Sequence, residues 1–213
     1  MRLLRDKWLL GSSEIALIGL FSTLCFSIFV LPSFAQNVKQ ADGRLPFRSG
    51  KSDAIAKVEV YYDLQCPSCA NFHSILKVVE NKFGDKVSVT FRHFPLDIPA
   101  HDKAFLAARV VEAARVQGKG REMLDLIMAN QANWTATKSA AIIFVGYATA
   151  LKLNIKHFRE DFESDSVIHG IVNDIERAKT LGVKSVPTIF VNGKELTYAE
   201  ALDLETIIQN LVK

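Results

Sequence analysis

The sequence predicts an α/β fold whose strands are interrupted by a long helical stretch. Residues 56–64 and 86–96 are rich in Val and aromatic residues and indicate two strands, and 67–83 between them has a helical pattern. About 70 residues of helical pattern follow before the chain returns to strand at 186–196. This order favours an α/β domain that carries an all-helical insertion.

The predicted strands and the turn within the last of them have clear local signals. Val87, Val89 and Phe91 alternate with polar residues, which is the period of a strand with one buried face. The last strand contains Asn192 and Gly193 in succession, the favoured pair for a two-residue hairpin turn. We therefore expect this region to form two paired strands.

Capping residues predict where the helices begin and end. Asn154 and Asp165 stand where helices would start, and Gly118, Gly120 and Gly182 stand where helices would stop. A last helical pattern follows the predicted hairpin and closes the chain.

Residues 1–35 have the composition of an export signal. Three basic residues precede an uncharged apolar run at 15–30, and Ser33 and Ala35 fit the small residues before a signal-peptidase cut. Cleavage would leave a chain that starts at Gln36. Because the run is 16 residues long, a retained membrane anchor is the alternative. Either case predicts a periplasmic or extracytoplasmic protein.

Charge and composition exclude some classes of partner. Without residues 1–35, 23 basic side chains face 21 acidic ones, so the net charge falls from +3 to +2. No basic cluster is interleaved with aromatic residues, so we expect no nucleic-acid partner. Residues 36–54 are polar, contain two glycines and a proline, and indicate a linker. We expect a monomer.

Two of the three cysteines, Cys66 and Cys69, stand three positions apart in "CPSC". A disulfide between them closes a tiny loop and constrains the unfolded chain little, so stabilising the fold is not its purpose. A structural zinc site needs about four ligands. His73 could be a third, but no fourth is near in sequence, so no metal is expected. A C-x-x-C motif beside a strand–helix–strand unit is typical of a thioredoxin-like redox site.

The position of the motif suggests different roles for the two cysteines. Cys66 falls at the start of the predicted helix, where unpaired backbone N–H groups and the helix dipole stabilise a thiolate. Pro67 suits the first helical turn because it has no N–H to satisfy. Cys69 lies on the same face and is expected to be more buried and less ionised.

Three stretches in this order resemble the DsbA-like thiol–disulfide oxidoreductases: "YYDLQCPSC", "FRHFPL" followed by "HDKAFLAARVVEAA", and "SVPTIFVNG". The resemblance covers roughly residues 55–212. It implies a thioredoxin fold, made of residues 55–98 and 166–213, with an all-helical insertion at 99–165. No cofactor is expected beyond the redox-active cysteine pair.

The resemblance also implies roles for individual residues. Cys66 would be the nucleophile and Cys69 the resolving thiol. Pro187 would be a cis-proline that, with Val186, presents backbone to a substrate peptide beside the sulfurs. Asp63 matches an acidic residue common just before the motif of this branch.

Two positions depart from the family pattern. Many relatives carry a buried glutamate six residues before the first cysteine, able to move the proton of the second thiol. This chain has Val60 there, and strand alternation places Glu59 on the opposite face. The strongest oxidant of the family has histidine before its second cysteine, where this chain has Ser68. Ser68 carries no positive charge, so the thiolate should be less favoured.

The resemblance implies an oxidase that donates its Cys66–Cys69 disulfide to exported cysteine-containing proteins and is reoxidised by a quinone-linked membrane partner. The alternatives are a disulfide isomerase or reductase of the same fold, and a thioredoxin-fold module that holds or chaperones exported partners. Trp134 is expected in the core. The remaining candidates are histidines, interpreted as surface or helix-face residues: His73, His93, His101, His157 and His169.

Overall fold

The computed structural model describes residues 47–213. The predicted signal or anchor at 1–35 and the first part of the predicted linker, 36–46, lie outside the described residues. Within the described part of the chain, no helix is both long enough and apolar enough to cross a membrane.

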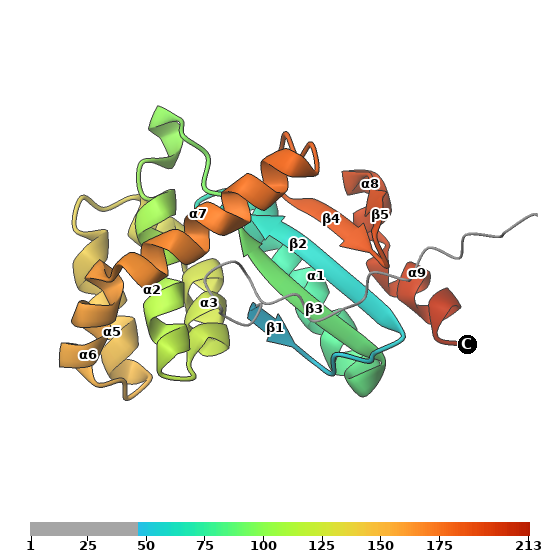
Figure 1. Ribbon diagram of the computed structural model, residues 1–213, viewed down its shortest axis with the longest axis horizontal. Helices are drawn as coiled ribbons and strands as arrows, with labels where there is room; N and C mark the ends of the chain where they lie inside the picture. Colours follow the sequence, from blue (N-terminus) through green and yellow to red (C-terminus); the bar gives the residue numbers. More distant parts are fainter. Residues whose placement is uncertain (1–46) are drawn as a thin grey trace, which may run out of the picture. The chain divides into compact units, whose positions relative to one another are not determined.

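The described strands form one five-stranded sheet in the order β1-β3-β2-β4-β5 (Figure 1). The central pair, β2 and β3, is parallel, and the other pairs are antiparallel. The strands are β1 Phe47–Ser49, β2 Ala56–Tyr62, β3 Val87–His93, β4 Thr188–Val191 and β5 Lys194–Leu196.

The edge strand β1 corrects the linker prediction. Residues 47–49 were assigned to the linker at 36–54, whereas the structure pairs them antiparallel with β3. Phe47 lies opposite Phe91, with ring centroids 5.1 Å apart. The sequence "FRS" is too short to show a period, so only its pairing partner makes it a strand.

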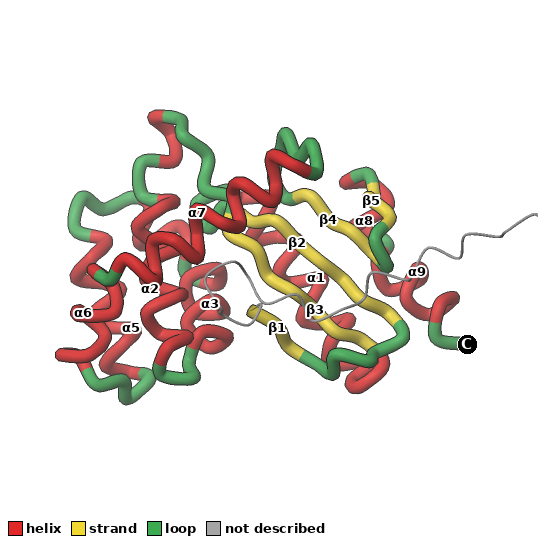
Figure 2. Tube along the Cα trace, viewed as in Figure 1, coloured by secondary structure: helices red, strands yellow, loops and turns green. Residues whose placement is uncertain are grey.

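Helices cover both faces of the sheet. The long helices α1 and α7 lie on opposite faces, and α9 packs against α1 (Figures 1 and 2). Two 3₁₀ turns, Gly84–Lys86 and Pro99–His101, flank β3. The α-helices are α1 Pro67–Phe83, α2 Ala104–Val116, α3 Gly120–Ala129, α4 Gln131–Thr135, α5 Ala140–Ala150, α6 Ile155–Glu163, α7 Asp165–Thr180, α8 Tyr198–Leu202 and α9 Leu204–Leu211.

The helices between β3 and α7 gather beside one end of the sheet (Figure 2). Helix α2 packs against both α3 and α6, and α5 contacts α3 and α6. Helix α7 contacts α2 and α6 near its start and also contacts β3. It therefore ties the inserted helices to the sheet.

Both faces of strand β2 are packed against other elements of the fold. Val58, Val60 and Tyr62 face the main core with α1, and Tyr61 joins a smaller cluster with Ala178 of α7. Glu59 shares the face of Tyr61 and pairs with Arg92 and Arg177. The expectation that Val60 and Glu59 point to opposite faces is confirmed.

Most predicted boundary residues lie at element ends. The Asn154 side chain caps α6 by accepting from the N–H of His157. Asn192 and Gly193 both have positive φ, 49° and 83°, as the two-residue turn between β4 and β5 requires. Gly120 was predicted to stop a helix, but it begins α3, where a Cβ would lie 2.7 Å from the Cβ of Arg115. Close packing therefore explains that glycine.

Candidate active site

The CPSC motif lies where β2 delivers the chain to the start of α1. Cys66 is the N-cap residue of α1 and Pro67 is its first helical residue. The Cys66 N–H donates to the carbonyl of Asp63, which closes the tight turn that leads into the helix. Both cysteines are free thiols, with Cys66 partly exposed and Cys69 buried.

Cys66 is surrounded by groups that favour its thiolate. Ser68 Oγ lies 3.0 Å from Cys66 Sγ, placed to donate a hydrogen bond to the charged sulfur. Hydrogen bonds from the Cys69 thiol, the Ser68 hydroxyl and the backbone of both residues lower the pKa of Cys66 to about 5, although partial burial opposes the shift. The backbone N–H groups of Ser68 and Cys69 belong to the first turn of α1, so the expected stabilisation of the thiolate by the helix start is part of this shift.

Cys69 has the opposite environment. It is a residue of the first turn of α1, and its side chain is fully buried. Burial, followed by its hydrogen bond to Cys66 and the nearby Cys66 charge, raises the pKa of Cys69 well above its usual value. At neutral pH the pair therefore holds one thiolate, on the partly exposed sulfur of Cys66, in agreement with the position of the two cysteines in the helix.

The loop that contains Val186 and Pro187 lies beside Cys66. The Val186–Pro187 peptide bond is cis, and the Val186 carbonyl oxygen lies 3.9 Å from Cys66 Sγ. The loop is anchored because β4 begins at the next residue, Thr188, which pairs with Tyr61. The structure thus brings together two motifs separated by 120 residues.

Asp63 holds the turn before the motif. Its carboxylate is fully buried, and it accepts from the backbone N–H groups of Gln65, at 2.7 Å, and Leu96, at 2.8 Å. The same carboxylate lies 2.6 Å from His101 Nδ1. Asp63 therefore fixes the backbone that carries Cys66.

A sequence model of the family described as "Thioredoxin" matches residues 45–210. The chain belongs to this thioredoxin family. The predicted thioredoxin fold with a helical insertion is confirmed by this family match and by solved DsbA-like structures of the same architecture.

Two solved structures illustrate the thioredoxin-family fold of this chain. The alpha-DsbA1 structure from Wolbachia pipientis has a TM-score of 0.64 at 21% identity, covering 78% of this chain and 90% of that one. BdbD from Bacillus subtilis has a TM-score of 0.63 at 18% identity, with 78% and 92% covered. At these identities the likeness establishes the fold.

Curated relatives with higher identity carry a different name. A protein of Mycolicibacterium gilvum named Na(+)/H(+) antiporter NhaA 1 is 35% identical over 149 residues, which are 68% of this chain and 23% of that protein. A protein of the same name from Mycobacterium sp. strain KMS is 34% identical over 161 residues, 74% of this chain and 25% of that protein. This chain thus spans about a quarter of their length.

Two residues of this thioredoxin-family site were missed in the sequence analysis. Gln131 of α4 donates through Nε2 to the carbonyls of Leu64, at 2.9 Å, and Cys66, at 3.0 Å. Gln65 bonds to the carbonyl of Ala100 and to the Asp102 carboxylate. Glutamines lack a local sequence signal, and only the folded chain brings Gln131 to the motif.

The interpretation of the histidines as surface or helix-face residues is wrong for His93, which is a buried residue of strand β3, whereas His73 lies on a helix face that is buried. His73 and His93 are buried, with Nε2 contacting Asp125 at 2.7 Å and Glu112 at 3.2 Å. The carboxylates satisfy one ring nitrogen of each and so permit burial. Trp134 is in the core as expected, where it donates to the Ile127 carbonyl.

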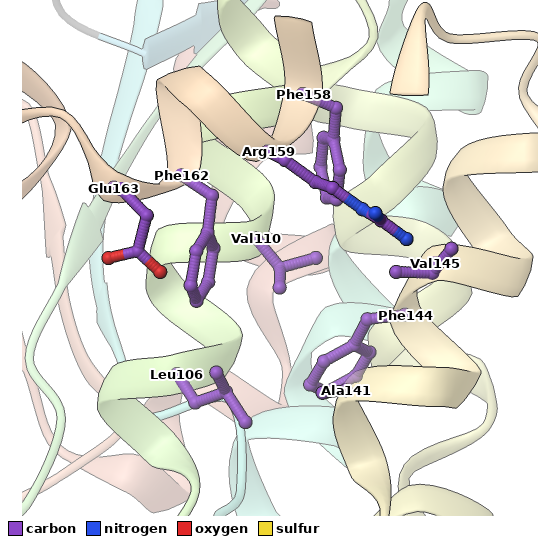
Figure 3. Close-up of a pocket in the computed structure, with 9 residues that line it drawn as sticks. All are labelled: Leu106, Val110, Ala141, Phe144, Val145, Phe158, Arg159, Phe162 and Glu163. Atoms are coloured by element: carbon purple, nitrogen blue, oxygen red, sulfur yellow. The ribbon is translucent and has the colours of Figure 1, made fainter. Parts of the chain in front are cut away.

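A separate apolar pocket lies among the inserted helices (Figure 3). The rings of Phe144, Phe158 and Phe162 point toward it from α5 and α6, and Arg159 and Glu163 stand at its edge. None of its lining residues is a cysteine or histidine. The lining of this pocket therefore offers no side chain of the kind found in the CPSC motif.

Proposed function

We propose that this protein is an extracytoplasmic thiol:disulfide oxidoreductase that donates its Cys66–Cys69 disulfide to exported proteins. The observation that carries the proposal is the pairing of a partly exposed thiolate with a buried thiol. A stabilised thiolate is a good leaving group and favours the reduced form, which is the property of a disulfide donor.

In the proposed reaction a substrate thiolate attacks Cys66 Sγ, the exposed sulfur of the disulfide. The Cys66–Cys69 bond breaks, Cys69 leaves and is protonated, and a mixed disulfide joins the substrate to Cys66. A second substrate thiolate then attacks the substrate sulfur of that mixed disulfide. The substrate leaves oxidised, and the Cys66 thiolate is released to the donors of Ser68 and the helix start.

The backbone beside Cys66 has hydrogen-bonding groups that suit an extended peptide as the substrate. The carbonyl of Val186 lies next to the sulfur, and Pro187 cannot donate an N–H, so the loop offers acceptors to an extended chain. Reoxidation by a quinone-linked membrane protein and export through residues 1–35 complete the proposal. Apart from the redox-active cysteine pair, no cofactor is part of it.

Trapping of mixed disulfides tests the proposal. Cys69→Ala should accumulate mixed disulfides with exported proteins, because Cys66 remains reactive and the resolving thiol is missing. Cys66→Ala should accumulate none, because its remaining thiol is buried. Non-reducing gels of acid-quenched cells that express each variant give the readout. Equal trapping by both variants, or by neither, would contradict the roles and favour a holding module.

A further inference from the structure

Resolution by Cys69 poses a proton-transfer problem. When the reduced protein reacts with an external disulfide, Cys66 attacks first, and Cys69 must then lose its proton and attack Cys66 Sγ. The Cys69 side chain is fully buried, so its proton needs an acceptor inside the protein. The only carboxylate of β2 is Glu59, which points to the other face and pairs with Arg92.

The nearest buried carboxylate before the motif is also fully engaged. Asp63 Oδ1 accepts from the Gln65 N–H, and Oδ2 contacts both the Leu96 N–H and His101 Nδ1. A carboxylate that already receives three donors is a weak proton acceptor.

His73 lies four residues after Cys69 on the same face of α1. Residues at this spacing are about 5–6 Å apart at Cβ, and helical side chains lean toward the N-terminus, here toward Cys69. The His73 side chain is 3% exposed, and its Nε2 contacts Asp125 Oδ1 at 2.7 Å. Within the described residues, Nδ1 has no hydrogen-bond partner. Donation from Nε2–H to the carboxylate leaves Nδ1 with a free lone pair.

Tyr62 supplies a second unpartnered polar atom in the same enclosure. Its ring packs edge-on against His73 with centroids 5.9 Å apart, and its buried hydroxyl has no partner among the described residues. Burial, and then the charge of Cys69, raise the pKa of Tyr62 well above its usual value, so the hydroxyl keeps its proton. Buried polar atoms without partners are rare in folded proteins and call for a functional reason.

Charged groups connect this enclosure with the surface. Asp125 of α3 pairs with Arg121 and Lys77 as well as with His73. Arg121 also pairs with Glu80 and lies over the Phe91 ring of β3. The Asp125 side chain is 27% exposed, so a proton on His73 is one residue away from solvent.

We propose that His73, oriented by Asp125, is the proton acceptor for Cys69, and that the Tyr62 hydroxyl lies on the path between them. This inference rests on the proposed dithiol function. The Cys69 S–H bond breaks, and the proton passes to His73 Nδ1. The Cys69 thiolate attacks Cys66 Sγ, the bond from Cys66 to the external sulfur breaks, and that thiolate leaves. The imidazolium, paired with Asp125, then returns its proton to solvent.

The two chemical steps can be observed separately with an aromatic disulfide that releases a coloured thiolate. Mixing it in equal amount with the reduced protein should release one thiolate when Cys66 attacks and a second when Cys69 resolves. Cys69→Ala should keep only the first phase. His73→Gln keeps an N–H for Asp125 but removes the base, so its second phase should slow about 100-fold at neutral pH. Its first phase should be unchanged.

The pH profile separates a base from a structural residue. In His73→Gln the second phase should rise steadily with pH and approach the wild-type rate, because hydroxide replaces the missing acceptor. His157→Gln, a matched change at an exposed histidine of α6, should leave both phases unchanged. Asp125→Asn, at a partly exposed position, should slow the second phase as well, and it tests the path independently of how His73→Gln folds.

A wild-type second phase in both His73→Gln and Asp125→Asn, with an unchanged pH profile, would overturn the inference. So would an equal slowing of both phases at every pH, because that result indicates a general structural defect. Loss of the first phase from the wild-type protein would instead contradict the proposed dithiol function.

Discussion

At the scale of single residues, Ser68 is the side chain between the cysteines that acts on the thiolate. Its Oγ lies 3.0 Å from Cys66 Sγ. Among the groups that lower the Cys66 pKa, the Ser68 hydroxyl has the largest effect after the Cys69 thiol. Unlike histidine it brings no charge, so its effect is that of one hydrogen bond to an ion.

Ser68→Ala should therefore raise the pKa of Cys66 by about one pH unit, the effect of losing one charge-assisted hydrogen bond. Titration of thiolate absorbance against pH in the reduced proteins measures this, starting from a wild-type midpoint of about 5. Ser74→Ala is the matched control, because the exposed Ser74 hydroxyl donates to the backbone carbonyl of Ala70 within α1. An unchanged midpoint in Ser68→Ala would show that the backbone donors alone stabilise the thiolate.

The sequence predicts residues whose role depends on local position and misses those that depend on tertiary contacts. Cys66 at a helix start and Cys69 one turn later follow from spacing and helix geometry alone. The burial of His73 does not, because it depends on Asp125, 52 residues away on another helix. Gln131 likewise reaches the motif only through the fold.

At the scale of elements, a buried ion pair connects α7 to the sheet. Arg92 Nη1 of β3 lies 2.8 Å from Asp174 Oδ1 of α7, and Asp174 Oδ2 accepts from the N–H of His93. Arg92 and Asp174 are 8% and 5% exposed. The helix position is therefore fixed by charge as well as by apolar contact.

Asp174→Ala should lower the free energy of unfolding by about 3 kcal/mol, because it leaves the Arg92 guanidinium buried with less compensation. Glu176→Ala, two positions along the same helix, removes an exposed ion pair with Lys179. This substitution should change the free energy of unfolding by less than about 0.5 kcal/mol. Urea unfolding followed by circular dichroism gives both values. Equal effects of the two substitutions would show that α7 is held by apolar contacts alone.

Long elements were predictable because their periodicity is strong, and short ones were not. Helix α1, Pro67–Phe83, has the bounds that its pattern predicts. The three-residue strand β1 was assigned to a linker, and Gly120 was assigned to a helix end instead of a helix start. In both cases the structure of the segment depends on a contact with another element. Strand β1 forms because it pairs with β3, and position 120 is glycine because Arg115 lies close to it.

At the scale of the whole molecule, the thiolate links redox state to stability. Only the reduced protein has a Cys66 thiolate, and the folded protein lowers its pKa from 9.0 to about 5. Whatever stabilises this thiolate therefore stabilises the reduced fold over the oxidised one. By the thermodynamic cycle, the same free energy favours donation of the disulfide.

The stability of the reduced protein relative to the oxidised one should therefore depend on pH in a defined direction. A lowered pKa contributes stability that is complete above the unfolded value of 9.0 and is lost as pH falls through about 5. The difference in unfolding free energy, reduced minus oxidised, should decrease steadily from pH 8 to pH 4. Urea unfolding of both forms at matched pH measures it. Cys66→Ser, which lacks the thiolate, should not show this loss of stability relative to the oxidised protein, and a pH-independent difference in the wild type would contradict a stabilised Cys66 thiolate.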